Sequence, residues 1–301
     1  MRIGTRRSAL ALAQAGLVAD RLEVSEQGGC EIIPIVTRGD RGAPAEDKSR
    51  WVQELEDALL DGDIDLAVHS AKDVPGAPAD GLALLGSTAR AAPEDALCGA
   101  GGLDELARGA RVGTSSVRRA AQLRAAREDL DVVGVRGNVD TRVRKLQEGG
   151  LDAIVLARAG LERLHLDDAI GAVLDPRRFV PAPGQGTLAL QARADRTDVA
   201  AAVAPISDAA TFACLLAERA LARSLDADCH TPLGAFAAAV DGGLELRAWV
   251  GLPDGSEWVS DELAGEISDP EALGHMVAER LELLGARRIL QGARETTVQG
   301  T

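Results

Sequence analysis

The stretch RIGTRRSALALAQAGLVAD, residues 2–20, joins a short β-like run to a helical pattern through a Gly-Thr turn. The same arrangement recurs as RVGTSSVRRAAQL, residues 111–123. Two further pairs of similar segments follow in the same order: VTRGD at 36–40 resembles VRGN at 135–138, and DLAVHS at 65–70 resembles DAIVLA at 152–157. One such match could be coincidence, but three in one order predict two similar lobes with a cleft between them.

Short β-like runs alternate with helical patterns from the N-terminus to about residue 200. This alternation is typical of βαβ units and a parallel sheet, so the predicted fold class is α/β with doubly wound lobes. The expected strands are Arg2–Thr5, Glu31–Thr37, Asp65–Ser70, Leu82–Gly86, Ala110–Thr114, Asp131–Val135, Asp152–Ala157 and Thr187–Ala192. The expected helices include Ser8–Leu22, Trp51–Leu60, Ser116–Arg127 and Val139–Gln147.

Pro and Gly become frequent in FVPAPGQG, residues 179–186, where the chain is expected to cross between the lobes. A long helix over Asp208–Leu225 and a small α+β domain are predicted to follow. Its expected elements are strands at Ala235–Val240, Leu244–Val250 and Glu257–Ser260, hairpin turns at 241–243 and 253–255, and a helical stretch over Asp269–Gln291.

Composition limits the possible partners. The chain has no Tyr, three Phe and three Trp, which leaves no aromatic platform for stacked bases, and its net charge is −14. Nucleic acid is therefore not expected as a partner. No run approaches 18 consecutive apolar residues, and Leu10, Ala13 and Leu17 follow the spacing of a core-facing helix, so neither a membrane span nor a signal peptide is expected.

The four cysteines lie far apart, without a C-x-x-C pair, at positions 30, 98, 214 and 229. This spacing gives little support to a metal site and fits reduced thiols in a cytoplasmic protein. Cys229 lies in the polar turn DADCHTP, residues 226–232, while the other three lie in more apolar settings. A protonated His230 would favour the Cys229 thiolate and the flanking aspartates would oppose it, so a reactive thiol and an ordinary one both remain possible.

The two Gly-Thr turns are candidate anion sites, because a helix N-terminus presents unpaired backbone N–H groups. Hydroxyl and guanidinium groups strengthen both turns; they belong to Thr5, Arg6 and Ser8 in the first and to Thr114, Ser115, Ser116, Arg118 and Arg119 in the second. Carboxylates or phosphate could bind there. The alternative is that Ser and Thr only cap the helices while the Arg side chains face water.

Asp73 lies in HSAKDVP, residues 69–75, directly after a predicted strand. Ligands of open α/β sheets bind beyond the carboxyl ends of strands. Asp73 could therefore stabilise developing positive charge or transfer protons. An Asx-type turn before Pro75 is the alternative interpretation.

The chain resembles the porphobilinogen deaminase (hydroxymethylbilane synthase) family in eight segments that occur in the family's order. They are RIGTRRSALALAQ, VTRGD, DLAVHSAKDVP, VGTSSVRRAAQL, VRGNVDTR, DAIVLARAGLERL, PAPGQG and the Cys229 turn. The resemblance implies two lobes like those of type II periplasmic binding proteins and a C-terminal α+β domain with a three-stranded antiparallel sheet. It implies domain 1, the catalytic lobe, at 1–88 with 187–204, an Arg-rich domain 2 at 94–180, and a cofactor-attachment domain 3 at 209–301.

The resemblance also implies the chemistry. Four porphobilinogens are joined head to tail with loss of four ammonia, and hydrolysis gives hydroxymethylbilane for tetrapyrrole (haem) biosynthesis. Asp73 matches the family's catalytic aspartate, and Cys229 matches the cysteine that forms a thioether to a dipyrromethane cofactor. The other residues implied to bind the cofactor are Lys72, Thr114, Ser116, Arg118 and Arg119. Those implied to bind substrate are Arg6, Ser8, Arg136, Arg142, Arg163 and Gln185.

The resemblance also implies a monomer that binds porphobilinogen. It implies no metal and no nucleotide.

The sequence departs from the family in three places. The loop at 41–50 is short and lacks a Gly-rich run, Trp51 stands where Phe is usual, and Ala227-Asp228 replaces a Gly pair before Cys229. A non-catalytic, pyrrole-binding or regulatory paralogue on the same fold is the alternative, although retention of Asp73 and Cys229 argues against it.

Overall fold

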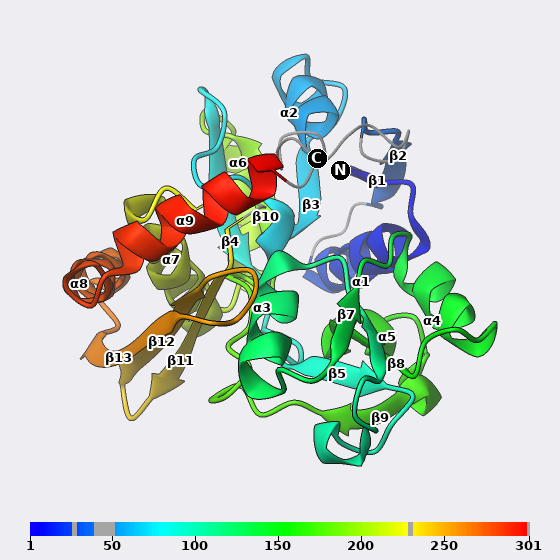
Figure 1. Cartoon of the computed structure of the whole chain (residues 1–301). Helices are drawn as coiled ribbons and strands as arrows, with labels where there is room; N and C mark the ends of the chain where they lie inside the picture. The colour runs from blue at the N-terminus through cyan, green and yellow to red at the C-terminus, as the bar shows by residue number, and fades with distance from the viewer. Residues whose placement is uncertain (26–28, 39–51, 228–230, 300–301) are drawn as a thin grey trace.

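The computed structural model describes residues 1–25, 29–38, 52–227 and 231–299. Three sheets organise this part of the chain (Figure 1). Two are five-stranded and mixed, and the third is three-stranded and antiparallel. The expectations for Cys229, the loop at 41–50, Trp51 and the Ala227-Asp228 replacement involve positions outside the described residues.

The first sheet has the strand order β2-β1-β3-β10-β4. Its strands are β1 (Arg2–Arg6), β2 (Glu31–Ile35), β3 (Leu66–Ser70), β4 (Leu82–Ser87) and β10 (Leu188–Arg193). The helices of this lobe are α1 (Ala9–Ser25), α2 (Gln53–Leu60) and α6 (Thr197–Val203). α1 packs against Leu66 and Val68 of β3, whereas α2 packs against Ala67 on the other face, because successive strand residues point to opposite sides.

The second sheet has the order β7-β6-β8-β5-β9. Its strands are β5 (Asp95–Cys98), β6 (Arg111–Gly113), β7 (Asp131–Val133), β8 (Ala153–Ala157) and β9 (Ile170–Val173). Its helices are α3 (Val117–Ala126), α4 (Val139–Gln147) and α5 (Arg158–Glu162). α3 packs on Val155 of β8 through Leu123, and α4 packs on Ile154 through Val143, so this sheet is also covered on both faces.

The two sheets repeat one arrangement, which confirms the two lobes predicted from the paired segments. The expectation of a parallel sheet is wrong for one strand in each. β10 runs antiparallel to β3 and β4, and β5 runs antiparallel to β8 and β9. Each of these strands follows a segment that crosses from the other lobe and so enters its sheet from the opposite end. β5 and β9 were missing from the predicted strands.

The third sheet is a meander of β11 (Leu233–Val240), β12 (Gly243–Gly251) and β13 (Trp258–Glu266). It packs against α7 (Ala209–Ser224), α8 (Pro270–Leu283) and α9 (Ala286–Gln299) (Figure 1). The predicted terminal helical stretch is two helices, because the chain turns at Gly285, whose φ is +100°. The remaining short helical turns are Ala71–Asp73, Leu103–Glu105, Asp167–Ala169 and Ala204–Ile206.

Within the described ranges, no single helix is both long enough and apolar enough to cross a membrane. The segments Thr197–Ile206 and Ala209–Ser224 reach that length and apolarity only together, as a pair bent by 110°.

Candidate active site

Asp73 lies at the carboxyl end of β3, in the helical turn Ala71–Asp73. Its side chain lines a pocket together with Arg6 from the end of β1 and Ser8 from the start of α1. In the part of the chain that the structure describes, the Asp73 carboxylate forms no hydrogen bond or ion pair. The fold therefore brings three of the expected site residues into one pocket and leaves the carboxylate available to a ligand.

The segment that crosses between the lobes holds the Asp73 turn in place. Ala71 N–H donates to the carbonyl of Thr187 at 3.0 Å, and Val74 N–H donates to the carbonyl of Ala71 at 3.2 Å. Gly184 has φ +76° and lies so close that a Cβ there would come within 2.9 Å of Ala71. Only glycine accommodates both the backbone angle and this close contact.

His69 lines the same pocket and is fully neutral near pH 7. Its Nε2 lies 2.9 Å from Oε1 of Gln191 on β10, and Nε2 of Gln191 donates to Oε1 of Glu56 at 2.9 Å. Burial lowers the pKa of His69 to about 4, although the hydrogen bond with Gln191 and the nearby Asp73 oppose the shift. The imidazole therefore contributes a polar but uncharged wall beside Asp73.

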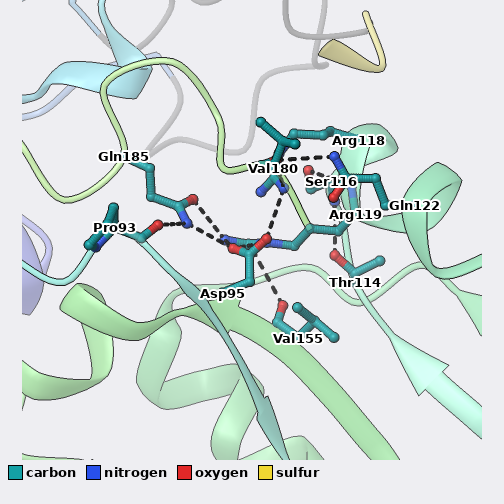
Figure 2. Close-up of polar contacts among 10 residues, drawn as sticks. All are labelled: Pro93, Asp95, Thr114, Ser116, Arg118, Arg119, Gln122, Val155, Val180 and Gln185. Atoms are coloured by element: carbon teal, nitrogen blue, oxygen red, sulfur yellow. Dashed lines mark hydrogen bonds and ion pairs between the residues drawn. The ribbon is translucent and has the colours of Figure 1, made fainter. Parts of the chain in front are cut away.

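A buried ionic cluster centred on Asp95 occupies the start of β5 (Figure 2). Oδ2 of Asp95 accepts from Nη1 of Arg118, and Oδ1 accepts from Nε of Arg119, both at 2.8 Å. Nε2 of Gln185 also donates to Oδ1 at 2.8 Å. Burial by itself raises the pKa of Asp95, but the charges and hydrogen bonds of the two arginines outweigh it and hold the pKa well below its usual range.

Arg118 and Arg119 were expected to face carboxylates of the cofactor, and the structure places both in this cluster, 3% and 6% exposed. Two guanidiniums face one carboxylate, so the cluster carries excess positive charge. Nε of Arg118 is buried and, within the described residues, has no hydrogen-bond partner. A further anion would satisfy both the charge and this donor.

The positive charges of Lys72 and Arg142 interact electrostatically with both Arg119 and Asp73. Burial lowers the pKa of Lys72 to about 8; the charge of Arg119 adds to the shift, while Asp73 and Asp95 oppose it. Burial also lowers the pKa of Arg142 to about 10, with Arg119 adding to the shift and Asp73 opposing it. Arg142 belongs to α4 of the second lobe, so cations of one lobe act on the carboxylate of the other.

Ser8 and Ser116 cap the helices that follow the two Gly-Thr turns. Oγ of Ser8 accepts from Ala11 N–H at 3.3 Å, and Oγ of Ser116 accepts from Arg119 N–H at 3.4 Å. Thr114 accepts from Ser116 N–H at 3.2 Å. A hydroxyl that accepts a capping bond retains its own proton, so the capping role leaves each side chain able to donate to an anion.

The remaining expected residues lie in different settings. Nη2 of Arg163 donates to the carbonyl of Gly186 in the crossing segment at 2.7 Å. Arg136 is exposed between β7 and α4. Gln185, expected to bind substrate, is 1% exposed and donates to Asp95 and to the carbonyl of Pro93. Cys229 lies outside the described residues.

Sequence reasoning missed Asp95, although it stands beside Pro93 and Glu94 at the start of a short apolar run. It also missed a buried ion pair in which Nη1 of Arg90 lies 2.7 Å from Oε1 of Glu218 on α7. Gly184 N–H donates to the other Glu218 oxygen, so α7 is bonded to the crossing segment. The position of Glu218 in the middle of an Ala/Leu-rich helix was the feature of the sequence that could have indicated this ion pair.

The described residues contain no group of three or more His, Cys, Asp or Glu side chains arranged to hold a metal ion.

Comparison with known proteins gives a consistent result along the chain. Residues 1–201 match the family model described as porphobilinogen deaminase, dipyromethane cofactor binding domain, and residues 212–282 match porphobilinogen deaminase, C-terminal domain. The chain is 46% identical over 298 residues to the porphobilinogen deaminase of Roseiflexus sp. (strain RS-1), covering 96% of this chain and 98% of the relative. It is 45% identical over 296 residues to that of Thiobacillus denitrificans, covering 96% and 97%.

Among solved structures, a methionine-binding protein is similar with a TM-score of 0.46 and 14% sequence identity. The similarity covers 68% of this chain and 87% of that protein.

Proposed function

The chain belongs to the porphobilinogen deaminase family, and from this premise we propose which of its residues carry out the reaction. The activity is that of a hydroxymethylbilane synthase, a transferase of tetrapyrrole biosynthesis that joins four porphobilinogens with release of four ammonia. The domains are assigned to 1–88 with 187–204, to 94–180 and to 209–301. The protein acts as a cytoplasmic monomer.

Asp73 is the catalytic carboxylate. When the amino group of porphobilinogen leaves as ammonia, positive charge develops on the pyrrole nitrogen, and a carboxylate nearby stabilises that charge. The same carboxylate can take part in the proton transfers of the step. The observation that carries this assignment is that the Asp73 oxygens have no partner among the described residues while Arg6 and Ser8 share their pocket.

The substrate is held by its acetate and propionate groups, which suit charge-assisted hydrogen bonds from guanidiniums. Arg6 and Ser8 line the Asp73 pocket, and Arg142 acts on Asp73 from the second lobe. These three are the best supported substrate contacts. Arg136, Arg163 and Gln185 complete the proposed set, and Gln185 also donates a hydrogen bond to Asp95.

The family model names a dipyrromethane cofactor, and the second lobe fits such a group. An anion would offset the excess positive charge around Asp95 and could accept a hydrogen bond from the unpaired Nε of Arg118. Lys72 supplies a further positive charge nearby. Arg118, Arg119, Lys72, Thr114 and Ser116 would hold the carboxylates of the cofactor. When bound, the dipyrromethane supplies the pyrrole to which the first substrate is joined.

Cys229 is the proposed point of attachment by a thioether. The properties of Cys98 and Cys214 support this choice. Burial raises the pKa of Cys98 and of Cys214 to about 11, so both thiols stay protonated and are poor nucleophiles. In the sequence, Cys229 follows shortly after the end of α7, in a polar turn.

Intact-mass measurement of the purified protein tests the attachment. Wild type and Cys30→Ser are expected to carry the added mass of a dipyrromethane and to consume porphobilinogen, while Cys229→Ser is expected to carry no added mass. An unmodified and inactive wild-type protein after incubation with porphobilinogen would instead support a pyrrole-binding protein without turnover.

A further inference from the structure

Helix α7 of the third domain packs directly against the turn that carries Asp73. Leu215 of α7 is 1% exposed and belongs to a small apolar cluster with Ala71 and Val74, which flank Lys72 and Asp73. Arg219 lies one helical turn after Leu215, on the same side of the helix. The third domain therefore reaches the proposed catalytic turn through an apolar and then a polar contact.

The Arg219 guanidinium binds the backbone immediately after Asp73. Nη2 donates to the carbonyl of Pro75 at 2.7 Å and to that of Gly76 at 2.9 Å, and Nη1 lies 3.5 Å from the carbonyl of Val74. Three successive carbonyls thus converge on one planar cation. A buried backbone carbonyl needs a hydrogen-bond donor, and Arg219 supplies donors to these three.

Arg219 is a costly residue to bury in this place. Its side chain is 5% exposed, and burial lowers its pKa to about 10, with the charge of Arg223 adding to the shift. Within the described ranges its hydrogen bonds go only to carbonyl oxygens, with no carboxylate among them. A buried cation without an ion-pair partner is unfavourable for folding alone.

We propose that Arg219 is a positioning residue for the reaction: it fixes the 74–76 backbone so that the Asp73 carboxylate keeps its place in the pocket. The inference rests on the proposed role of Asp73. The neighbouring Glu218 binds the crossing segment, and Cys229 follows α7 in the sequence. One helix therefore holds the Asp73 turn and the crossing segment and leads to the proposed attachment point.

The experiment compares Arg219→Lys with wild type and with Arg223→Lys, each as the full chain carrying its cofactor. Arg223 lies one turn farther along α7, and its ion pair with Glu271 is at the surface, so it controls for a change of guanidinium on the same helix. A lysine at 219 keeps the charge but cannot bridge three carbonyls. The readouts are kcat, KM for porphobilinogen, the cofactor mass and the unfolding midpoint.

We expect Arg219→Lys to lower kcat by about tenfold while KM changes by less than about twofold. The Arg219→Lys protein is expected to carry the full added mass of the cofactor. Arg223→Lys should have the kcat and KM of wild type. An unchanged kcat in Arg219→Lys, or a loss that falls on KM or on cofactor loading instead, would overturn the proposal.

Three further variants keep the test decisive. Arg219→Ala is expected to regain part of its kcat when guanidinium is added at low concentration, and Arg223→Ala is expected to show no such gain. Absence of rescue would count against the positioning role. Asp73→Asn is assayed in parallel: wild-type turnover in that variant would refute the role of Asp73 itself, whereas an inactive Asp73→Asn beside a fully active Arg219→Lys refutes the positioning role alone.

Discussion

Nη1 of Arg118 lies 2.8 Å from Oδ2 of Asp95, and both side chains are almost completely buried. Asp95 is the only carboxylate in this cluster that faces two guanidiniums within the described residues, so its charge is required to keep Arg118 and Arg119 inside the second lobe.

Asp95→Asn is expected to destabilise the protein by about 3 kcal/mol, because loss of one member of a buried ionic cluster leaves charges that water cannot reach. The free energy of unfolding in urea measures this. Asp131→Asn is the control, since Asp131 pairs with Arg111 at the surface, where both side chains are more than half exposed. It should cost less than about 1 kcal/mol. Equal losses in the two variants would contradict the account of the cluster.

His69 is expected to make stability depend on pH. Its pKa is about 4 in the folded protein and about 6.5 when unfolded. The unfolded chain therefore binds the extra proton between these values, and the stabilisation is fully present above pH 6.5 and is lost as the pH falls toward 4. The loss is up to about 1.4 kcal/mol per pH unit. His69→Gln keeps a donor for Gln191 but does not titrate, so its unfolding free energy should fall less between pH 6.5 and 5. Parallel curves for the two proteins would exclude this role.

Lys72 is expected to make ligand binding by the unloaded protein sensitive to alkaline pH. Its pKa of about 8 means that the ammonium loses its charge as the pH rises above that value. Lys72→Arg keeps its charge, so the ratio of its rate of cofactor loading to that of wild type should increase between pH 7 and 9. Taking the ratio removes the effect of thiol ionisation, which both proteins share. A ratio independent of pH would show that the Lys72 charge does not contribute.

The paired strand–Gly-Thr–helix segments predicted the two lobes because the strand and helix patterns are local properties of the sequence. The Asp95 cluster is not local: its bonds join positions 23 and 24 residues apart on α3 and 90 residues apart to Gln185. His69 and Gln191 are separated by 122 residues. Arg118 and Arg119 were expected to bind carboxylates of the cofactor. Among the described residues, both bind a carboxylate of the protein, that of Asp95.

Asp73 and Arg219 show the same difference between what the local sequence predicts and what depends on tertiary packing. The position of Asp73 after a strand could be inferred from the segment alone, because ligands gather at that end of a sheet. The support that Arg219 gives to the following carbonyls could not, since it requires the third domain to pack on the first lobe across more than 140 residues of sequence.

The most direct test is the rate of hydroxymethylbilane formation by Asp73→Asn, with the attached cofactor confirmed by mass. Asp80→Asn, at an exposed position in the loop that follows the same turn, is the control. We expect a fall in kcat of at least about 100-fold for Asp73→Asn and a wild-type rate for Asp80→Asn. A fully loaded Asp73→Asn protein that turns over porphobilinogen at a rate close to wild type would contradict this role of Asp73.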